Sequence, residues 1–280
     1  MEKVTISSEG HQLSGRLYPA GVRTPVAVVL CHGAFEHQGN WANLAESLTE
    51  EGLTTLTFDF VGHGESEGLR GWVDLRIWAY NIRDAMNYLA TKGYRRFALV
   101  GWDSGGSATI LATVHDSRVR CAVTLATPIF LMPPIGERLA FGLATVAASV
   151  KRTLWKKPLT LSRIAELEEM RIAVDDETNN KYLHDPLIRA CYQAVPVPES
   201  LHSAWLDITR AVRKVNKPML IIHGTHDAVL PVDQSKKLHA ALQGEKQLLF
   251  LQGVGHAIHL DRQYEQVYKT ISKWLRQHLN

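Results

Sequence analysis

The stretch Leu99–Gly106 (LVGWDSGG) is an apolar run that ends at an acidic residue flanked by glycines and leads into a segment with helical character. Gly101 and Gly105 lie two residues on either side of Asp103. This spacing is typical of the sharp turn between a strand and a helix that presents a nucleophilic side chain. Both flanking positions are small, because a Cβ atom there would collide with its neighbours. Serine is the usual residue at the apex, so Asp103 is the unusual feature of this chain.

Strands and helices alternate on both sides of this turn. Strands are expected at residues 3–8, 12–19, 26–31, 54–59, 96–100, 119–126, 218–223 and 247–251. Helices are expected at residues 40–51, 74–91, 104–115 and 232–242, and from residue 261 onward. The run at 26–31 (VAVVLC) is continuously apolar, as in strands covered on both faces. The pattern predicts an α/β fold with a mostly parallel, eight-stranded sheet and helices on both faces.

The alternation stops between residues 127 and 215, where helical patterns occur without a convincing strand. We therefore expect a core made of residues 1–128 and 216–280, with residues 129–215 inserted as a helical cap. No internal repeat or low-complexity tract is present.

Composition narrows the class of protein. The chain has 280 residues, of which 45% are hydrophobic and 21% charged, as expected of a globular protein with a substantial core. A net charge of +3 without a basic stripe argues against a nucleic-acid partner. No apolar run reaches the length of a membrane span, and residues 1–10 do not resemble a signal peptide. The three widely spaced cysteines favour reduced thiols and a cytoplasmic location.

Several motifs occur in an order that resembles the α/β-hydrolase fold over essentially the whole chain, and most closely its monoacylglycerol lipase, lysophospholipase and feruloyl esterase branch. They are CHGA at 31–34, FDFVGHGES at 58–66, the 101–105 turn, DPL at 185–187, HGTHD at 223–227 and GH at 255–256. That branch has serine where this chain has Asp103. Aspartate at this position is similar to the epoxide hydrolases and haloalkane dehalogenases of the same fold.

The resemblance implies a catalytic set in the order nucleophile, acid, histidine, which gives Asp103, Asp227 and His256. Asp227 and His256 each follow a predicted strand, at the sheet edge where open α/β sheets bind ligands. The backbone N–H groups of Ala34 and Ser104 are the expected oxyanion hole. Ser104 itself is disfavoured as the nucleophile, because Trp102 would then occupy a position that must be small. Neither a metal nor a cofactor is expected.

The substrate pocket is expected to be apolar and to take a small-to-medium molecule, since apolar residues dominate 129–155. Its expected lining residues are His32, Phe35, Trp102, Phe130, Met132, Tyr182, Tyr192 and Trp205. Asp59 and His63 are expected to be structural. The apolar cap helix has a basic end at residues 151–157. We expect it to pack on the core, with contact to a membrane surface as the alternative.

An aspartate nucleophile restricts the reaction. Attack on an ester would produce a tetrahedral intermediate holding a carboxylate of pKa about 4 against an alkoxide near 16. The difference corresponds to about 16 kcal/mol in favour of expelling Asp103 again. Displacement at an sp3 carbon has no such difficulty, because the resulting alkyl ester belongs to the enzyme and His256 activates water against it.

An epoxide is therefore the favoured substrate, with Tyr182 and Tyr192 available as proton donors. A halide is less favoured, because dehalogenases of this fold usually have tryptophan where this chain has Ser104. One alternative is an esterase or lipase scaffold in which the nucleophilic serine is replaced by aspartate. Another is a receptor that binds a small apolar ligand without turnover. The sequence leaves the oligomeric state open.

Overall fold

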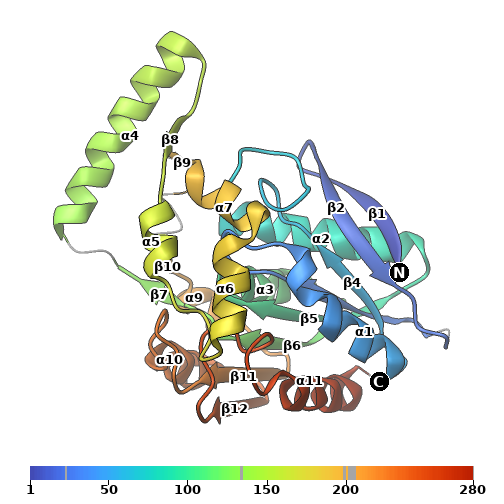
Figure 1. The fold of residues 1–280 in the computed structure, drawn as a ribbon. Coiled ribbons are helices and arrows are strands. Elements are labelled where there is room, and N and C mark those ends of the chain that lie inside the picture. Colours follow the sequence, from blue (N-terminus) through green and yellow to red (C-terminus); the bar gives the residue numbers. More distant parts are fainter. Residues whose placement is uncertain (23, 133–134, 198–199, 201–205, 280) are drawn as a thin grey trace.

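The computed structural model describes the chain apart from residues 23, 133–134, 198–199, 201–205 and 280, and its centre is one eight-stranded sheet (Figure 1). The strand order is β1-β2-β4-β3-β5-β6-β11-β12. The strands are β1 Glu2–Ser8, β2 His11–Tyr18, β3 Val26–Cys31, β4 Thr54–Phe58, β5 Arg96–Trp102, β6 Val119–Leu125, β11 Met219–Gly224 and β12 Lys246–Leu251. Pairing is antiparallel from β1 to β4 and parallel from β4 to β12. The predicted mostly parallel, eight-stranded sheet is confirmed.

Helices cover both faces of this sheet. They are η1 Gln38–Trp41, α1 Ala42–Glu50, α2 Leu75–Thr91, α3 Asp103–His115, α10 Asp233–Ala241 and α11 Tyr264–His278. Helices α2 and α3 contact each other on one face, and α1 and α11 contact each other on the other. Helix α2 begins where the Asp74 carboxylate accepts hydrogen bonds from the N–H groups of Arg76 and Ile77. Its buried side follows the predicted helical period.

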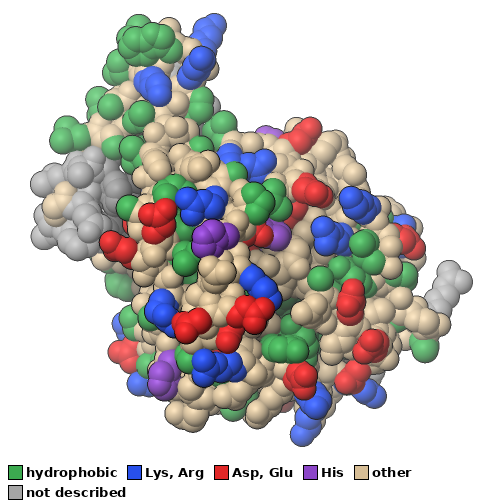
Figure 2. All heavy atoms as spheres, viewed as in Figure 1, with side chains coloured by type: hydrophobic (Ala, Val, Ile, Leu, Met, Phe, Trp, Pro, Cys, Tyr) green, Lys and Arg blue, Asp and Glu red, His purple; other side chains and the backbone are tan. Residues whose placement is uncertain are grey.

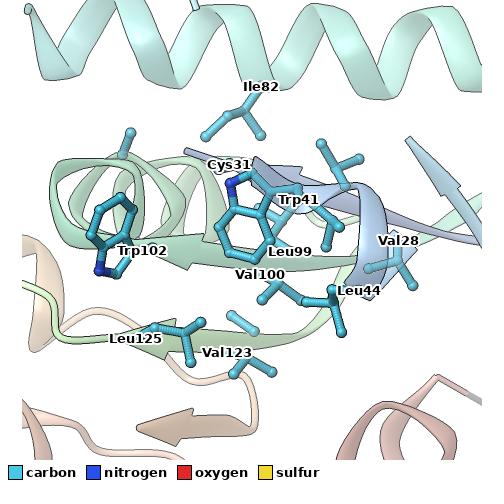
Figure 3. Close-up of a cluster of buried hydrophobic side chains, with 14 of the residues drawn as sticks. Val28, Cys31, Trp41, Leu44, Ile82, Leu99, Val100, Trp102, Val123 and Leu125 are labelled. Atoms are coloured by element: carbon cyan, nitrogen blue, oxygen red, sulfur yellow. The ribbon is translucent and has the colours of Figure 1, made fainter. Parts of the chain in front are cut away.

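The core is densest around β5, which lies between β3 and β6 in the middle of the sheet. All six residues of β3 and six of the seven residues of β5 are buried. Figure 3 shows Trp41 near Leu99 and Val100, Trp102 farther along towards the turn, and Leu125 on the neighbouring strand. Burial on both faces fixes the position of the end of β5, and with it the turn that follows.

The segment between β6 and β11 contains both helices and short strands. The helices are α4 Ile135–Trp155, α5 Ile164–Glu169, α6 Asp176–His184, α7 Pro186–Gln193 and α9 Thr209–Val212, and the strands are β7 Phe130–Leu131, β8 Leu159–Leu161, β9 Val195–Val197 and β10 Leu206–Asp207. These strands form two antiparallel pairs, β7 with β10 and β8 with β9. The expectation of a strand-free segment was therefore wrong. Strands of two or three residues are too short to show a period in the sequence.

Helix α4 extends away from the rest of the molecule together with β8 (Figure 1). Leu143, Val146, Leu154 and Trp155 are each more than 60% exposed, and apolar side chains are visible along this arm in Figure 2. Only Ala148 of its described side chains is buried, in a small cluster with Val197. The expectation that this helix packs on the core is therefore wrong for its described side chains. None of the described helices combines the length and the apolar character that crossing a membrane requires.

Candidate active site

Asp103 occupies the apex of a strained turn between β5 and α3. Its φ is +51°, in the left-handed region that side chains other than glycine rarely adopt. A Cβ atom on Gly105 would lie 2.0 Å from the carbonyl oxygen of His32, and one on Gly101 would lie 2.6 Å from that of Gly105. Both flanking positions therefore exclude larger residues, as the sequence predicts. The neighbouring Ser104 adopts the α-helical conformation of α3.

A backbone donor from a second loop meets the Asp103 carboxylate. This loop follows β3, and the N–H of Ala34 donates a hydrogen bond of 3.1 Å to Asp103 Oδ2. A Cβ atom on Gly33 would approach the Asp103 Cβ atom to 3.1 Å, so the two loops are closely packed. Ser104 is the second residue of α3, where backbone N–H groups have no partner within the helix. The two expected oxyanion-hole residues therefore flank Asp103.

His256 lies between the two aspartates. Its Nδ1 atom is 2.8 Å from Asp227 Oδ2, and its Nε2 atom is 3.9 Å from Asp103 Oδ1. The side chains of His256 and Asp227 are 4% and 0% exposed, whereas that of Asp103 is 20% exposed. Since a carboxylate accepts only, Nδ1 carries a proton towards Asp227, and Nε2 is the nitrogen that faces Asp103. The structure thus brings together the three residues that the sequence pattern selects.

Asp227 is held by a residue that sequence reasoning missed. His223 Nε2 lies 3.0 Å from Asp227 Oδ2, and His223 Nδ1 lies 2.7 Å from the Ser235 hydroxyl. Asp227 Oδ1 accepts hydrogen bonds from the N–H groups of Val229 and Leu230. His223 is four residues before Asp227 in the HGTHD motif, but the motif alone does not distinguish a second imidazole on the carboxylate from a buried histidine of the strand.

These contacts determine the charges at the site. Burial opposes ionisation of Asp227, but the hydrogen bonds from His223 and His256 outweigh it and hold the pKa of Asp227 well below its usual range. Burial also disfavours the His256 imidazolium. The hydrogen bond to Asp227 and the charges of Asp227 and Asp103 prevail, so the pKa of His256 is raised. An ionised Asp227 thus orients His256 and stabilises its protonated form.

Two further contacts fix the loop that carries His256. Trp102 Nε1 donates a 2.9 Å hydrogen bond to the carbonyl oxygen of His256. The buried Asp261 carboxylate accepts hydrogen bonds from four backbone N–H groups, which belong to Val174, Asp175, Gly255 and Arg262. Asp261 therefore ties the His256 loop to the segment between β6 and β11. Sequence reasoning also missed Asp261, since no motif marks it.

Tyr182 of α6 and Tyr192 of α7 are buried and lie within electrostatic reach of Asp103. Burial is the main cause of the raised pKa of each tyrosine, and the negative charge of Asp103 adds to it. The Phe35 ring lies 4.6 Å from the Tyr192 ring, and Phe35 is itself buried with φ +62°. Three of the expected pocket residues are thus buried, two of them under the influence of the Asp103 charge and the third in ring contact with Tyr192.

The other expected lining residues have different surroundings. His32 and Trp102 are buried beneath the turn, where His32 Nε2 accepts a hydrogen bond from the N–H of Phe60 and the Trp102 ring lies 5.1 Å from the His256 ring. Phe130 lines a separate cavity of about 480 Å³ beside Arg213 and Lys237. Met132 is 54% exposed. These four assignments remain predictions, because apolar character in a sequence does not distinguish a pocket wall from core or surface. Trp205 lies outside the described residues.

The two residues expected to be structural have contacts that fit this role. The Asp59 carboxylate accepts hydrogen bonds from the Gln38 backbone and side chain and from the N–H of Glu65. Burial lowers the pKa of His63 to about 4, and its Nδ1 contacts the carbonyl oxygen of Val61. Among the described residues, no three histidine, cysteine or acidic side chains are grouped so that they would hold a metal ion.

Comparison with known proteins gives the family. A family model described as serine aminopeptidase, S33, matches residues 23–263, so the chain belongs to this family of α/β-hydrolases. With the sheet and the turn described above, the protein is a hydrolase of the α/β-hydrolase fold.

Individual relatives are similar over nearly the whole chain. The monoglyceride lipase of Rattus norvegicus is 28% identical over 96% of this chain and 88% of its own length. The monoacylglycerol lipase of Mycolicibacterium smegmatis is 23% identical over 90% and 88%. Among solved structures, the DcsB complex with its substrate analogue has a TM-score of 0.86 at 18% identity, covering 99% of both chains. The monoacylglycerol lipase of Paleococcus ferrophilus has a TM-score of 0.73 at 23% identity, covering 95% of this chain and 99% of that one.

Proposed function

We propose that this hydrolase opens a carbon–oxygen bond at an sp3 carbon, with an epoxide as the substrate class, through an alkyl ester on Asp103. The observation that supports this most is that the two oxygens of the Asp103 carboxylate have different partners. Oδ2 accepts the hydrogen bond from Ala34, and Oδ1 faces His256 Nε2 at 3.9 Å. One oxygen is thus held by a backbone donor while the other is directed towards the site.

In the first step, Asp103 Oδ1 forms a bond to the epoxide carbon and the ring carbon–oxygen bond breaks. The departing oxygen takes a proton from a phenol, and Tyr182 and Tyr192 are the phenols that we propose for this role, because the charge of Asp103 acts on both. Both tyrosines come from α6 and α7, so residues 129–215 act as a cap that supplies the acids while the core supplies the nucleophile.

In the second step, His256 Nε2 takes a proton from water, and the hydroxide adds to the Asp103 carbonyl carbon. Asp103 Oδ2 then carries the negative charge, and the Ala34 N–H that already contacts it stabilises that charge. The intermediate expels the product alkoxide, which takes the proton from His256, and the carboxylic acid left on Asp103 returns its proton to the phenolate of the first step. The enzyme ester is cleaved at its acyl carbon, so Asp103 keeps one oxygen atom from water.

This last feature provides the test. A single turnover of styrene oxide in 18O-labelled water, followed by mass spectrometry of the peptide containing Asp103, is expected to show label in that side chain. The His256→Gln variant should accumulate the unhydrolysed alkyl ester at the same residue. Label in the diol alone, with no ester in the variant, would overturn the proposal.

A second candidate is a lipase or esterase scaffold in which aspartate has replaced the nucleophilic serine. The similarity to monoglyceride lipases and to a Bacillus subtilis carboxylesterase favours it. Asp103→Ser places a hydroxyl at the same apex, within the same histidine and backbone arrangement. If this candidate is correct, the variant gains hydrolysis of p-nitrophenyl butyrate, and the parent protein neither converts styrene oxide nor forms an ester with it.

A further inference from the structure

Helix α4 is covered on one side and exposed on the other. On the covered side, Ala148 forms a buried pair with Val197 of β9, and Ala144 and Leu159 pack against this pair. Away from that contact, the helix extends from the core beside β8, and apolar side chains are visible along it (Figures 1 and 2). The exposed side is therefore an apolar surface that the described part of the chain does not cover.

The exposed apolar positions have a regular spacing. They are Leu143, Ala147, Val150 and Leu154, which are separated by four, three and four residues. All four are exposed, and the three larger side chains are each more than half exposed. This is the heptad spacing that keeps one line of side chains directed at a partner helix over several turns. We call these four residues the α4 stripe.

The spacing of the α4 stripe reads the same in both directions. A second copy lying antiparallel, with a two-fold axis between positions 148 and 149, would match every position of the stripe. Leu143 would lie against the partner's Leu154. Ala147 would lie against the partner's Val150, so that a small side chain meets a β-branched one near the axis. A surface that complements its own copy in this way is what a two-fold symmetric interface requires.

The polar groups beside the stripe tolerate burial. The Ser149 hydroxyl donates a 2.9 Å hydrogen bond to the carbonyl oxygen of Thr145, and the Thr153 hydroxyl donates one of 2.9 Å to that of Ser149. Both hydroxyls therefore keep a partner when a second helix excludes water, and little is lost on burial. In the antiparallel arrangement, Val146 would lie beside the partner's Lys151, whose apolar stem can cover it while the ammonium group stays in water.

The charges near the stripe favour the antiparallel direction. Lys151, Lys156 and Lys157 lie at or beyond the C-terminal end of the stripe, and none of the four stripe residues is charged. Parallel helices would bring the lysines of both copies together. Antiparallel helices separate them and also place opposite ends of the two helix dipoles side by side.

The exposed area is sufficient for a dimer. Together with Val146, the α4 stripe presents on the order of 500 Å² of apolar surface, so two copies would bury on the order of 1,000 Å², the lower limit for a specific interface. A membrane surface is the other occupant that an apolar helix with nearby lysines suggests. Lipid binding depends on apolar area and charge and not on the order of the residues, so it does not account for the symmetric spacing.

We propose that the α4 stripe binds the α4 stripe of a second copy of this chain, as an antiparallel helix pair that joins two molecules. The contact includes none of Asp103, Asp227 and His256. It is therefore independent of the reaction proposed above and stands or falls separately. Because its area is small, the dimer should dissociate on dilution.

The first test is sedimentation velocity of the full chain between about 1 and 100 μM. The mass should rise with concentration from the 31.3 kDa of one chain to twice that value. Leu143→Lys should weaken dimerisation by about 10²-fold or more, since the change affects both ends of the helix pair. Val22→Lys alters an apolar side chain that is 63% exposed between β2 and β3 and should have no effect. A parent protein that stays monomeric, or a dimer that Leu143→Lys leaves intact, overturns the proposal.

A charge exchange tests the direction of pairing. Leu143→Lys/Leu154→Glu places opposite charges across each end of an antiparallel pair, but like charges across each end of a parallel pair. The double variant should regain about tenfold of the affinity lost in Leu143→Lys, whereas Leu143→Lys/Leu154→Lys should regain none. Equal dimerisation by the two double variants would contradict the antiparallel arrangement.

Oxidation of the Leu143→Cys/Leu154→Cys variant gives a second readout. Within one helix these positions are about 16 Å apart, too far for a disulfide, so any disulfide between them joins two chains. The three native cysteines are buried. We expect a covalent dimer in which peptide mass spectrometry finds position 143 linked to position 154. Links of 143 to 143 and of 154 to 154 would overturn the antiparallel pairing.

Vesicles test the other occupant. The parent protein is mixed with phosphatidylserine–phosphatidylcholine vesicles and centrifuged, and Leu143→Lys is treated in the same way. We expect no sedimentation of the parent with the vesicles beyond that of the variant. Vesicle binding by a monomeric parent that Leu143→Lys abolishes would assign this side of α4 to a membrane and overturn the proposal.

Discussion

Asp103 adopts a φ of +51° at the apex of a turn whose side chain is usually the hydroxyl of a serine. The turn is the one that presents serine in other hydrolases, and in the proposed function the difference lies in which substrates the Asp103 side chain is able to attack. Asp103, Asp227 and His256 were predictable from the sequence because each follows a strand and their chain order is informative. His223 was not, since its contact with the Asp227 carboxylate becomes visible only in three dimensions.

The Asp227–His256 pair leads to a prediction about pH. In the proposed mechanism, hydrolysis of the alkyl ester needs neutral His256. Because the pKa of His256 is raised, the rate is expected to fall on the acid side, below a pKa higher than the ordinary histidine value. Asp227→Asn removes the charge that favours the imidazolium. The acid limb of ester hydrolysis should therefore move to lower pH, and the rate at its maximum should drop by about 10² or more. Single-turnover hydrolysis rates measured against pH check this, and an acid limb at the same position in both proteins would contradict it.

At the scale of elements, the junction of β5 with α3 depends on close packing of three loops: the turn at Asp103, the loop after β3 and the loop that carries His256.

The strands of the sheet were predictable because β-branched runs and turn residues mark them, and the boundaries agree within a few residues. The short pairs β7–β10 and β8–β9 were not predictable, because two- and three-residue strands are defined by partners distant in sequence.

Gly105→Ala should destabilise the protein more than an ordinary glycine substitution. Its Cβ atom would lie 2.0 Å from the backbone oxygen of His32, which is not free to move without shifting β3. We expect a loss of about 3 kcal/mol in the free energy of unfolding. Gly142→Ala in α4 is the matched control, because no atom lies within 4 Å of the added Cβ. It should leave stability unchanged or raise it by up to about 1 kcal/mol. Denaturant unfolding of both variants distinguishes them, and equal effects would refute the packing argument.

Asp261 supports two elements at once, the loop of His256 and the start of α6. Asparagine in its place keeps the shape but has one acceptor oxygen, so two of the four N–H groups lose their partner. Asp261→Asn should cost about 3 kcal/mol and increase hydrogen exchange at the Val174 and Gly255 amides. Asp233→Asn removes an exposed carboxylate that pairs with Lys236 and should cost less than about 1 kcal/mol. Unchanged exchange at both amides in Asp261→Asn would count against this role.

At the scale of the whole molecule, the sequence predicted one large core with an insertion, because strands and helices alternate everywhere except in residues 127–215. The direction in which α4 extends was not predictable. The amphipathic pattern of the α4 sequence indicates that the helix has an apolar side, but it does not indicate which part of the protein, if any, covers that side.

Burial in the core also determines how readily the cysteine thiols of this protein react. All three cysteines are free and buried, and burial raises the pKa of Cys31 and Cys121 to about 12 and that of Cys191 to about 11. Because the thiolate is the reactive form, the native protein should react with Ellman's reagent only slowly. Three thiols per chain should react once denaturant unfolds it. Fast reaction of even one thiol in the native protein would show that the chain opens locally around it.

The hydrogen bond from the Ala34 N–H to Asp103 Oδ2 has a consequence for how such a protein is detected. Fluorophosphonate probes, which are used to survey serine hydrolases in cell extracts, need a nucleophilic hydroxyl and an empty donor for the phosphoryl oxygen. Here the enzyme's own oxygen fills that position, and a carboxylate attacking phosphorus would form an anhydride that water readily cleaves. Surveys with these reagents should leave this chain unlabelled, whereas under the proposed mechanism an epoxide-based probe should mark the His256→Gln variant, which does not cleave the ester.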